Sequence, residues 1–426
     1  MKVCVMGLGY IGLPTAVMFA SCGFRVHGVD INQEVINSLS LKKPHIEEPG
    51  LEETLGHVIE EGNLSFSKEP EEADAFIIAV PTPITKEKKA NIDYVRNAME
   101  MIVPCVKEGD LIILESTVPP GTVEKVMIQE LQKTGLKVGE EVFVSHSPER
   151  VLPGKLFEEL VSNDRIVGGI NQESADRTAS LYKHFVKGTI HITDAKTAEM
   201  VKLMENTYRD VNIALANELA QISDQLGCDV WEAIRLANFH PRVNIHQPGP
   251  GVGGHCIAVD PWFLHEASPD KAKLIETARR INDETPMYVG GLIEQITEFI
   301  TKPKVALLGL AYKGNIGDMR ESPSLKVISY LKKLNVEYTI YDPYVESKME
   351  EQVSTVEEAV KGADCIIMLT EHSAFKELDY KKLYDLMNNH NIIDTKNVLD
   401  EKLLCNIGFQ YKKVGKGASQ VPYLFS

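Results

Sequence analysis

Short apolar runs rich in β-branched residues alternate along the chain with longer stretches that mix apolar and polar positions. The short runs have the length and composition of buried strands, and the longer stretches are typical of helices that cover a sheet. The clearest predicted strands are residues 2–6, 25–29, 76–80 and 111–114 in the first part of the chain and 304–308, 365–369 and 391–394 in the last. Because strands that alternate with helices form parallel sheets, this pattern predicts two Rossmann-like, doubly wound α/β domains.

The two groups of strands repeat one plan. Lys-Val followed by a glycine-rich turn occurs at residues 2–12 and again at 304–314, and an Ala-Asp pair precedes a predicted strand at 73–74 and again at 363–364. The matching segments come in the same order in both halves. The last domain is therefore expected to be a structural copy of the first.

A long helical segment separates the two α/β domains. From 196 to about 226 the chain has no Gly or Pro, and Gly227 follows at once. A helix of this length is typical of a central connector or a dimerisation element, and glycine is a common stop signal. The expected domains are residues 1–195, 196–300 and 301–426.

Length and hydropathy indicate a large enzyme outside the membrane. A chain of 426 residues exceeds the size at which one core keeps growing, and 43 % hydrophobic residues can fill several cores. No apolar run approaches the roughly 20 residues of a membrane span, and the N-terminus lacks the features of a signal peptide. A cytoplasmic location is expected.

Charge and cysteine usage exclude several classes of function. The net charge of −16 disfavours nucleic acid or an anionic membrane surface as a partner, so any phosphate-bearing ligand must be held by locally placed cations. The seven cysteines include no CxxC pair and make an odd total. We therefore expect reduced thiols, without a disulfide framework or a metal site.

The first glycine-rich turn has the context of a dinucleotide site. Gly7-Leu8-Gly9-Tyr10-Ile11-Gly12 follows a predicted strand and opens a predicted helix over 13–20, and the next strand ends in Asp30. The glycines permit a tight turn and close approach of a pyrophosphate to the helix, while an acid at this spacing accepts hydrogen bonds from the ribose. Asp30 favours NAD over NADP. An ordinary α/β turn is the alternative, and the spacing of the acid argues against it.

Two further segments follow predicted strands at the edge where such sheets bind ligands. They are Val80-Pro81-Thr82-Pro83 and Glu115-Ser116-Thr117-Val118-Pro119-Pro120. Ordinary turn chemistry explains their prolines equally well.

The second glycine-rich turn differs from the first in two ways. Ala311 replaces the middle glycine, and two cations appear at Lys313 and Arg320. The alanine compromises tight packing of a dinucleotide, while the cations favour a different anionic nucleotide. The alternative is that both cations are simply solvated.

Cys256 is the candidate nucleophile. Three glycines within 251–254 precede it, and Asp260-Pro261 follows, which predicts a loop rather than a core strand. A thiol presented in this way beside a nicotinamide site indicates oxidation through a thiohemiacetal and a thioester, from alcohol to acid. The alternative is a small core residue. His255 is not assigned as a base because adjacent residues usually point apart.

The predicted long helix offers partners for the thiol. Lys202, Asn206 and Arg209 lie four and three residues apart and so share one face. Lys and Asn are the donor types that stabilise an oxyanion and relay a proton. A merely solvated face is the alternative.

Over essentially its whole length the chain resembles the UDP-glucose/GDP-mannose dehydrogenase family. Four separated motifs carry the resemblance and occur in order, at Ser147–Gly154, Glu199–Asn206, Phe239–Asn244 and Gly251–Trp262. The resemblance implies an N-terminal NAD domain and a C-terminal UDP-sugar domain joined by a long helical dimerisation region. It also implies a homodimer or higher homo-oligomer.

The resemblance further implies roles for individual residues. Cys256 would be the nucleophile, Lys202 the acid/base and oxyanion partner, Asn206 its helper, and Asp260 a group supporting Lys202 or the hydrolytic water. The implied substrate contacts are Arg150, Val151, Lys202, Asn206, Arg209, His240, Arg242, Gly253 and Lys313, with Arg242 supplied by the neighbouring subunit. The implied NAD contacts are Tyr10, Ile11, Asp30, Thr82, Thr117 and Arg320, beside Gly7, Gly9 and Gly12 of the turn.

Departures from the glucose branch of the family bear on the substrate. That branch usually has a lysine and a second glutamate where this chain has Val259 and Pro153. The hydrolytic water is therefore expected to depend on Glu149, Asp260 and ordered water. Arg150 replaces an aromatic residue and could bond an acetamido carbonyl.

The expected reaction is a four-electron oxidation of UDP-N-acetyl-D-mannosamine at C6 to the uronate, with two NAD reduced per sugar. The same chemistry on UDP-N-acetylglucosamine is the nearest alternative, since the two sugars differ only at C2, and UDP-glucose is a weaker one. A non-catalytic nucleotide-sugar sensor is the distant alternative.

Overall fold

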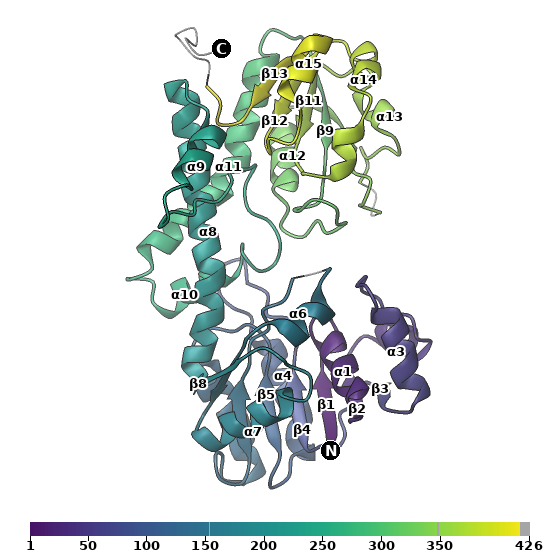
Figure 1. Cartoon of the computed structure of the whole chain (residues 1–426), viewed down its shortest axis with the longest axis vertical. Coiled ribbons are helices and arrows are strands. Elements are labelled where there is room, and N and C mark those ends of the chain that lie inside the picture. Colours follow the sequence, from purple (N-terminus) through teal and green to yellow (C-terminus); the bar gives the residue numbers. More distant parts are fainter. Residues whose placement is uncertain (153, 347–348, 418–426) are drawn as a thin grey trace. The chain divides into compact units, whose positions relative to one another are not determined.

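The computed structural model describes residues 1–152, 154–346 and 349–417. Its contacts divide the chain into two compact units (Figure 1). The first unit is Met1–Glu205 with Trp262–Lys271, and the second is Asn206–Pro261 with Ala272–Ser426. Each unit is described separately below.

The first unit is built on an eight-stranded sheet with the order β3-β2-β1-β4-β5-β6-β7-β8. Neighbouring strands are parallel except for β6 and β7, which pair antiparallel. The strands are β1 (Lys2–Met6), β2 (Arg25–Val29), β3 (Leu64–Ser67), β4 (Ala75–Ile78), β5 (Leu111–Leu114), β6 (Phe143–His146), β7 (Arg165–Gly169) and β8 (Ile190–Asp194).

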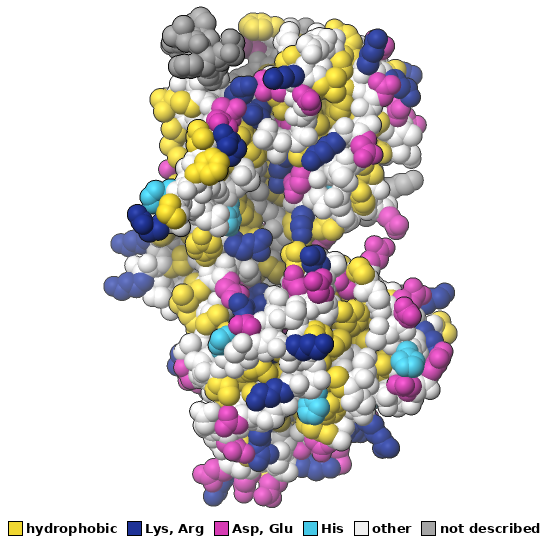
Figure 2. All heavy atoms as spheres, in the orientation of Figure 1, with side chains coloured by type: hydrophobic (Ala, Val, Ile, Leu, Met, Phe, Trp, Pro, Cys, Tyr) yellow, Lys and Arg dark blue, Asp and Glu magenta, His cyan; other side chains and the backbone are white. Residues whose placement is uncertain are grey.

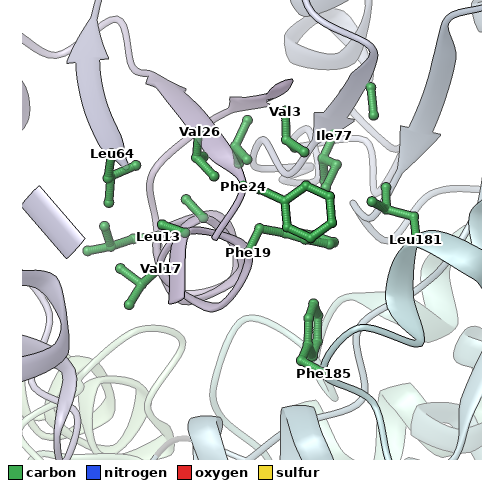
Figure 3. Packing of buried hydrophobic residues seen from close by; sticks show 14 of the residues in the cluster. Val3, Leu13, Val17, Phe19, Phe24, Val26, Leu64, Ile77, Leu181 and Phe185 are labelled. Carbon is green, nitrogen blue, oxygen red and sulfur yellow. The ribbon is translucent and has the colours of Figure 1, made fainter. Parts of the chain in front are cut away.

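Helices of the first unit cover this sheet and bury two apolar cores. They are α1 (Gly12–Ser21), α2 (Gln33–Ser40), α3 (Leu51–Glu60), α4 (Asp93–Ile102), α5 (Ile128–Leu131), α6 (Leu156–Ser162) and α7 (Gln172–Tyr182), with short turns η1 (Val103–Cys105), η2 (Val123–Met127) and η3 (Gln132–Thr134). In one core Phe19 of α1 meets Phe24 and Phe185 edge to face, with ring centroids 5.6 and 5.0 Å apart (Figure 3). This packing fixes α1, and with it the first glycine-rich turn, against the sheet.

The second unit contains a parallel five-stranded sheet with the order β10-β9-β11-β12-β13. Its strands are β9 (Lys304–Leu308), β10 (Glu337–Tyr341), β11 (Cys365–Met368), β12 (Asn391–Asp394) and β13 (Gln410–Lys413). The helices around it are α12 (Pro323–Lys333), α13 (Val356–Val360), α14 (Tyr380–Leu386) and α15 (Glu401–Ile407), with the turn η4 (Ser373–Glu377).

The remaining helices are α8 (Ala195–Leu226), α9 (Val230–Ala237), α10 (Asp260–Ala267) and α11 (Lys273–Thr297). Helix α8 has 32 residues and ends before Gly227, whose φ of +77° favours glycine. The long helix predicted over 196–226 is therefore confirmed. The division into three domains at 195 and 300 stays a prediction.

The two sheets confirm the predicted fold class and the internal repeat. Strands β2-β1-β4 and β10-β9-β11 have the same order, and each glycine-rich turn follows the central strand. The amide of Gly7 donates to Val29 O at 2.8 Å, and the amide of Gly309 donates to Tyr341 O at 2.9 Å. The second domain thus copies the first down to the first hydrogen bond of the turn.

Within the described part of the chain, no helix combines the length and the apolar character that a membrane crossing requires. On the face drawn in Figure 2, Lys and Arg side chains are interspersed with Asp and Glu side chains.

Candidate active site

The first glycine-rich turn is shaped for a pyrophosphate at the start of α1. A Cβ on Gly7, whose φ is +89°, would lie 2.8 Å from Ala79 O, and one on Gly12 would lie 1.8 Å from Gly7 O. A Cβ on Gly9 would meet nothing within 4 Å. Gly7 and Gly12 therefore serve the packing of the turn, whereas Gly9 keeps open the space over the helix N-terminus.

Asp30 is fixed at the end of β2 by the backbone. Its Oδ2 accepts from the amide of Leu8 at 3.0 Å and its Oδ1 from the amide of Asn32 at 2.9 Å. Each carboxylate oxygen has a further lone pair, so both can still accept from ribose hydroxyls. The residues present fit the NAD predicted for this turn. Tyr10 and Ile11 lie partly exposed beside it.

The two segments that follow β4 and β5 are bonded to each other. Thr82 Oγ1 donates to Thr117 O at 2.6 Å, and Ser116 Oγ donates to Val80 O at 2.7 Å. The two predicted NAD contacts, Thr82 and Thr117, are therefore joined by a hydrogen bond at the carboxyl edge of the sheet.

Glu149 belongs to a buried ionic network. Its Oε2 lies 3.0 Å from Arg165 Nη1, and Arg165 Nη2 lies 2.5 Å from Glu115 Oε1. Tyr182 also donates to Glu115 Oε1 at 2.6 Å. Burial raises the pKa of Glu115 to about 7, although Arg165 opposes the shift. One guanidinium thus pairs with two buried carboxylates, and Glu149 is held in place by this ion pair.

Arg150 is held by an acid of α8. Its Nε and Nη2 donate to the two carboxylate oxygens of Glu205 at 3.0 and 2.6 Å, and its Nη1 donates to Asp164 O at 3.0 Å. The predicted substrate contact is therefore rigid before any ligand binds. Val151 is half-buried against the first core, and Pro153 lies outside the described residues.

The predicted catalytic face of α8 changes in exposure along its length. Lys202 is half-buried, Asn206 is buried one turn later, and Arg209 is exposed after one more turn. Lys202 belongs to the first unit, while Asn206 and Arg209 belong to the second.

Cys256 lies in a loop, as the glycines around it predict, and its side chain is exposed. Its carbonyl accepts from the amides of Val259 and Asp260 at 3.0 and 2.8 Å. This turn leads directly into α10, so the cysteine stands at the N-terminal end of a helix. The positive end of a helix dipole stabilises a thiolate.

Asp260 and Asn206 are brought together in the second unit. Asp260 is buried, and its Oδ2 accepts from Asn206 Nδ2 at 2.6 Å. Two residues predicted to act beside Cys256 therefore form one buried pair.

The cysteine loop packs against the second glycine-rich turn. A Cβ on Gly253 would lie 2.6 Å from the Cβ of Tyr312, and one on Gly254 would lie 3.0 Å from its ring. The amide of Gly254 donates to Arg320 O at 2.9 Å. Lys313, half-buried in the same turn, is thereby brought near the loop that carries the thiol.

The second turn is closed where the first is open. Ala311 is 2 % exposed and packs in the core of the second unit. Asp342, which ends β10 as Asp30 ends β2, accepts at Oδ2 from the amides of Leu310 and Ala311 at 2.6 and 3.0 Å. His372 Nε2 lies 3.0 Å from the same oxygen. A buried carboxylate with these partners does not serve a ribose as Asp30 can.

Three other predicted contacts also lie in the second unit. Arg320 Nη2 lies 2.6 Å from Asp318 Oδ2. The contact of Arg320 with NAD stays a prediction. His240 and Arg242 are exposed in the segment that follows α9.

The sequence argument missed the network around Glu149 and the role of Asp342. A weak signal existed for Arg165, because it is a cation at the start of an apolar run, Ile166-Val167-Gly168-Gly169. The signal for Asp342 was its place at the end of the second strand of the repeat. Neither signal identifies the buried partner.

Comparisons with known proteins agree with these features. Three domains of the UDP-glucose/GDP-mannose dehydrogenase family match in order: the NAD binding domain at residues 1–186, the central domain at 196–284 and the UDP binding domain at 306–401. The chain is 48 % identical to a UDP-N-acetyl-D-mannosamine dehydrogenase of Methanococcus maripaludis, over 98 % of this chain and 97 % of that protein.

Two solved structures are similar over nearly the whole chain. The UDP-D-ManNAc dehydrogenase of Pyrococcus horikoshii superimposes with a TM-score of 0.93 at 43 % identity, covering 98 % of this chain and all of the other. Cap5O of Staphylococcus aureus, a UDP-N-acetyl-mannosamine dehydrogenase, gives 0.89 at 45 % identity, covering 98 and 99 %. The resemblance inferred from the four motifs is thereby confirmed.

Proposed function

Because the chain belongs to the UDP-glucose/GDP-mannose dehydrogenase family, we propose that it oxidises UDP-N-acetyl-D-mannosamine at C6 to UDP-N-acetyl-D-mannosaminuronate. It is an NAD-dependent dehydrogenase with a UDP binding domain. The observation that carries the choice of sugar is the 48 % identity, over nearly its whole length, to a relative with this activity.

The first unit would hold the cofactor, which accepts a hydride in each of the two oxidations. The space over Gly9 and the N-terminus of α1 suits the pyrophosphate, and Asp30 suits the ribose. The hydrogen-bonded pair of Thr82 and Thr117 would contact the nicotinamide.

Cys256 would carry the sugar between the two oxidations. Its thiolate attacks the C6 aldehyde, forming a C–S bond and an oxyanion that takes up a proton. The thiohemiacetal then loses its hydroxyl proton to water and its C6 hydrogen as hydride, which gives a thioester. Lys202 and Asn206, one turn apart on α8, are assigned as the donors that stabilise the oxyanion.

Hydrolysis of the thioester needs a group that activates water. Asp260 is a strong candidate because it follows Cys256 by one helical turn and is oriented by Asn206. Glu149 is a second candidate, although one of its carboxylate oxygens is already engaged by Arg165. We therefore propose Asp260 as the main group that activates the hydrolytic water.

Arg150 is proposed to select the N-acetyl sugar. The bidentate pair with Glu205 fixes its guanidinium plane, and a guanidinium has donors beyond the three used here for an acetamido carbonyl. Val259, in place of the lysine usual in the glucose branch, also disfavours UDP-glucose.

The test is an assay of purified protein with each nucleotide sugar. UDP-N-acetyl-D-mannosamine should yield two NADH per sugar, with a kcat/KM well above that for UDP-N-acetylglucosamine or UDP-glucose. A higher kcat/KM with UDP-N-acetylglucosamine would reassign the substrate. If none of the three sugars releases NADH and Cys256 is unreactive, the result would favour a non-catalytic nucleotide-sugar sensor.

A homodimer through α8 is proposed as the working form. Several apolar side chains on this helix are exposed at intervals of four or seven residues, as in a helix–helix seam: Met200, Met204, Tyr208, Leu215, Ile222 and Leu226. The dimer would let Arg242 of one subunit complete the site of the other. Seven free cysteines agree with a location in the reducing cytoplasm.

A further inference from the structure

The segment 249–260, which carries Cys256, is bonded at both ends to buried side chains of α8. At its start the amide of Gly249 donates to Asn217 Oδ1 at 2.9 Å, and at its end Asp260 accepts from Asn206 at 2.6 Å. Asn206 and Asn217 are about three turns apart and so point to the same side of the helix. One helix face therefore fixes the start and the end of the cysteine segment.

The bond at the start has no substitute within its tripeptide. Gly249 lies between Pro248 and Pro250, and all three residues are buried. Proline has no N–H, so Gly249 supplies the only amide donor of the three. Because a buried N–H without an acceptor is costly, the hydrogen bond to Asn217 stabilises this position of the loop.

Asn217 is itself held in one orientation. Its Nδ2 donates to Asn282 Oδ1 of α11 at 3.0 Å, and Asn282 Nδ2 donates to Asp210 Oδ1 at 2.8 Å. Asp210 Oδ1 also lies 2.6 Å from Arg279 Nη1. All four side chains are at most 1 % exposed. The network leaves Asn217 Oδ1 directed at Gly249.

The loop between Gly249 and Cys256 has little freedom of its own. Gly251 has φ of +133°, and a Cβ there would lie 3.1 Å from Asn282 O. Gly254 has φ of +81° and lies against the ring of Tyr312. The backbone is thus guided from Asn217 to the thiol by close contacts that tolerate no side chain.

We propose that Asn217 is a positioning residue for Cys256. By fixing the start of the loop, as Asn206 fixes its end, it keeps the sulfur where it can attack the C6 aldehyde. Asn217 touches neither the thiol nor the substrate, so its effect passes through the position of the loop. This role rests on the proposed function.

The two oxidations should depend on Asn217 differently. In the first, the C6 alcohol loses a hydride to NAD and a proton to water, and no bond to sulfur forms. In the second, the C–S bond must form before the next hydride leaves. A displaced loop therefore slows the second oxidation and releases aldehyde, whereas general loss of folded protein lowers both equally.

The test variant is Asn217→Ala, assayed in the presence of hydroxylamine, which traps free aldehyde. The ratio of trapped aldehyde to uronate should rise about tenfold, with the KM for NAD unchanged. The matched control is Val289→Ala, which opens a cavity at a fully buried position of α11 without removing a bond to the loop. Its aldehyde fraction should stay at the unmodified level even where its thermal stability falls. An unchanged ratio in folded Asn217→Ala overturns the proposal.

Asn217→Asp provides a rescue. A buried carboxyl takes up a proton, so its OH can donate to Asn282 while its other oxygen accepts from Gly249. The aldehyde fraction should return toward the unmodified level. A fraction as high as that of Asn217→Ala counts against the proposal.

Hydrogen exchange tests the bond without relying on turnover, and its first measurement needs only the unmodified protein. Pro248 and Pro250 carry no amide hydrogen, so deuterium localised to residues 248–250 reports on Gly249 alone. In the unmodified protein Gly249 should exchange far more slowly than exposed Arg242, and in Asn217→Ala about tenfold faster than before. Fast exchange in the unmodified protein overturns the proposal. If exchange behaves as expected but no UDP-sugar is oxidised, the proposed function fails instead.

Discussion

The Nδ2 of Asn206 lies 2.6 Å from Oδ2 of Asp260, in a buried pair one helical turn beyond Cys256. Asp260 therefore accepts a hydrogen bond that fixes the orientation of its carboxylate. A water from which this carboxylate takes a proton would lie close to the thioester that the water must attack.

Asp260→Asn should uncouple hydrolysis from oxidation. Both hydride transfers remain possible, so rapid mixing should show a burst of two NADH per site followed by turnover about 100-fold slower than in the unmodified enzyme. Mass spectrometry of the quenched enzyme should find the sugar acid on Cys256. Glu149→Gln is the comparison, with a smaller expected effect. If Asp260→Asn shows no burst and Glu149→Gln does, the roles must be exchanged.

Cys256→Ser should abolish release of free uronate, because only a nucleophile at this position can hold the aldehyde for the second oxidation. Turnover should fall about a thousandfold or more, with a little aldehyde released or an ester trapped. Cys405→Ser, at another exposed cysteine, should behave as the unmodified enzyme. Near-normal production of two NADH per sugar by Cys256→Ser would remove this thiol from the mechanism.

Asp30 should set the choice of cofactor. Its carboxylate would accept from ribose hydroxyls and would repel a 2′-phosphate, so kcat/KM should favour NAD over NADP by a large factor. Asp30→Ala should lower kcat/KM for NAD about tenfold and narrow the gap. Glu34→Ala, at an exposed acid four residues further on, is the control. Equal use of the two cofactors by the unmodified enzyme would contradict this assignment.

Glu115 should make the fold less stable as pH rises. Burial raises its pKa from 4.5 to about 7, so the folded chain binds this proton more tightly than the unfolded chain does. Its protonation supports the fold at low pH, and that support, about 3 kcal/mol, is lost between about pH 4.5 and 7.

Glu115→Gln keeps the shape of the protonated acid and should reduce the fall in Tm between about pH 5 and 8. Burial also raises the pKa of Glu199 to about 7, so part of the fall in Tm with pH should remain in this variant. Glu34→Gln is the exposed control. An identical slope in Glu115→Gln and the unmodified protein would show that Glu115 stays charged across this range.

Mixing two inactive variants tests the shared site. Each hybrid of Lys202→Ala and Arg242→Ala subunits would have one complete site and one doubly damaged site. Random exchange of equal amounts makes about half of the dimers mixed, so activity should recover to about a quarter of the unmodified value. If demonstrated exchange restores nothing, both residues act within one chain's site.

Local sequence patterns predicted the elements and the exposed chemistry well. The spacing from the first turn to Asp30, the glycines around Cys256, and the long segment without Gly or Pro each encode a feature formed by neighbours in the chain. These features depend on short-range geometry, which one sequence displays directly.

The buried polar partners could not be predicted in the same way. Arg165 meets Glu115 from a strand 50 residues away, and Asn217 meets Gly249, which lies 32 residues further along the chain. Such pairs are chosen by tertiary packing, and many other residues have the same local composition. The sequence marks them only as polar residues within apolar surroundings.

Ala311 marks a difference between the two copies of the α/β domain that bears on which ligand each copy suits. Ala311 takes the position of Gly9 in the repeat and is buried in the core of the second unit, while His372 pairs with Asp342, the counterpart of Asp30. Restoring glycine at 311 would therefore not create a second cofactor site, because the acid would still be sequestered. Two copies of one strand order can thus differ in the ligand that they suit through the residues of one turn and of one strand end.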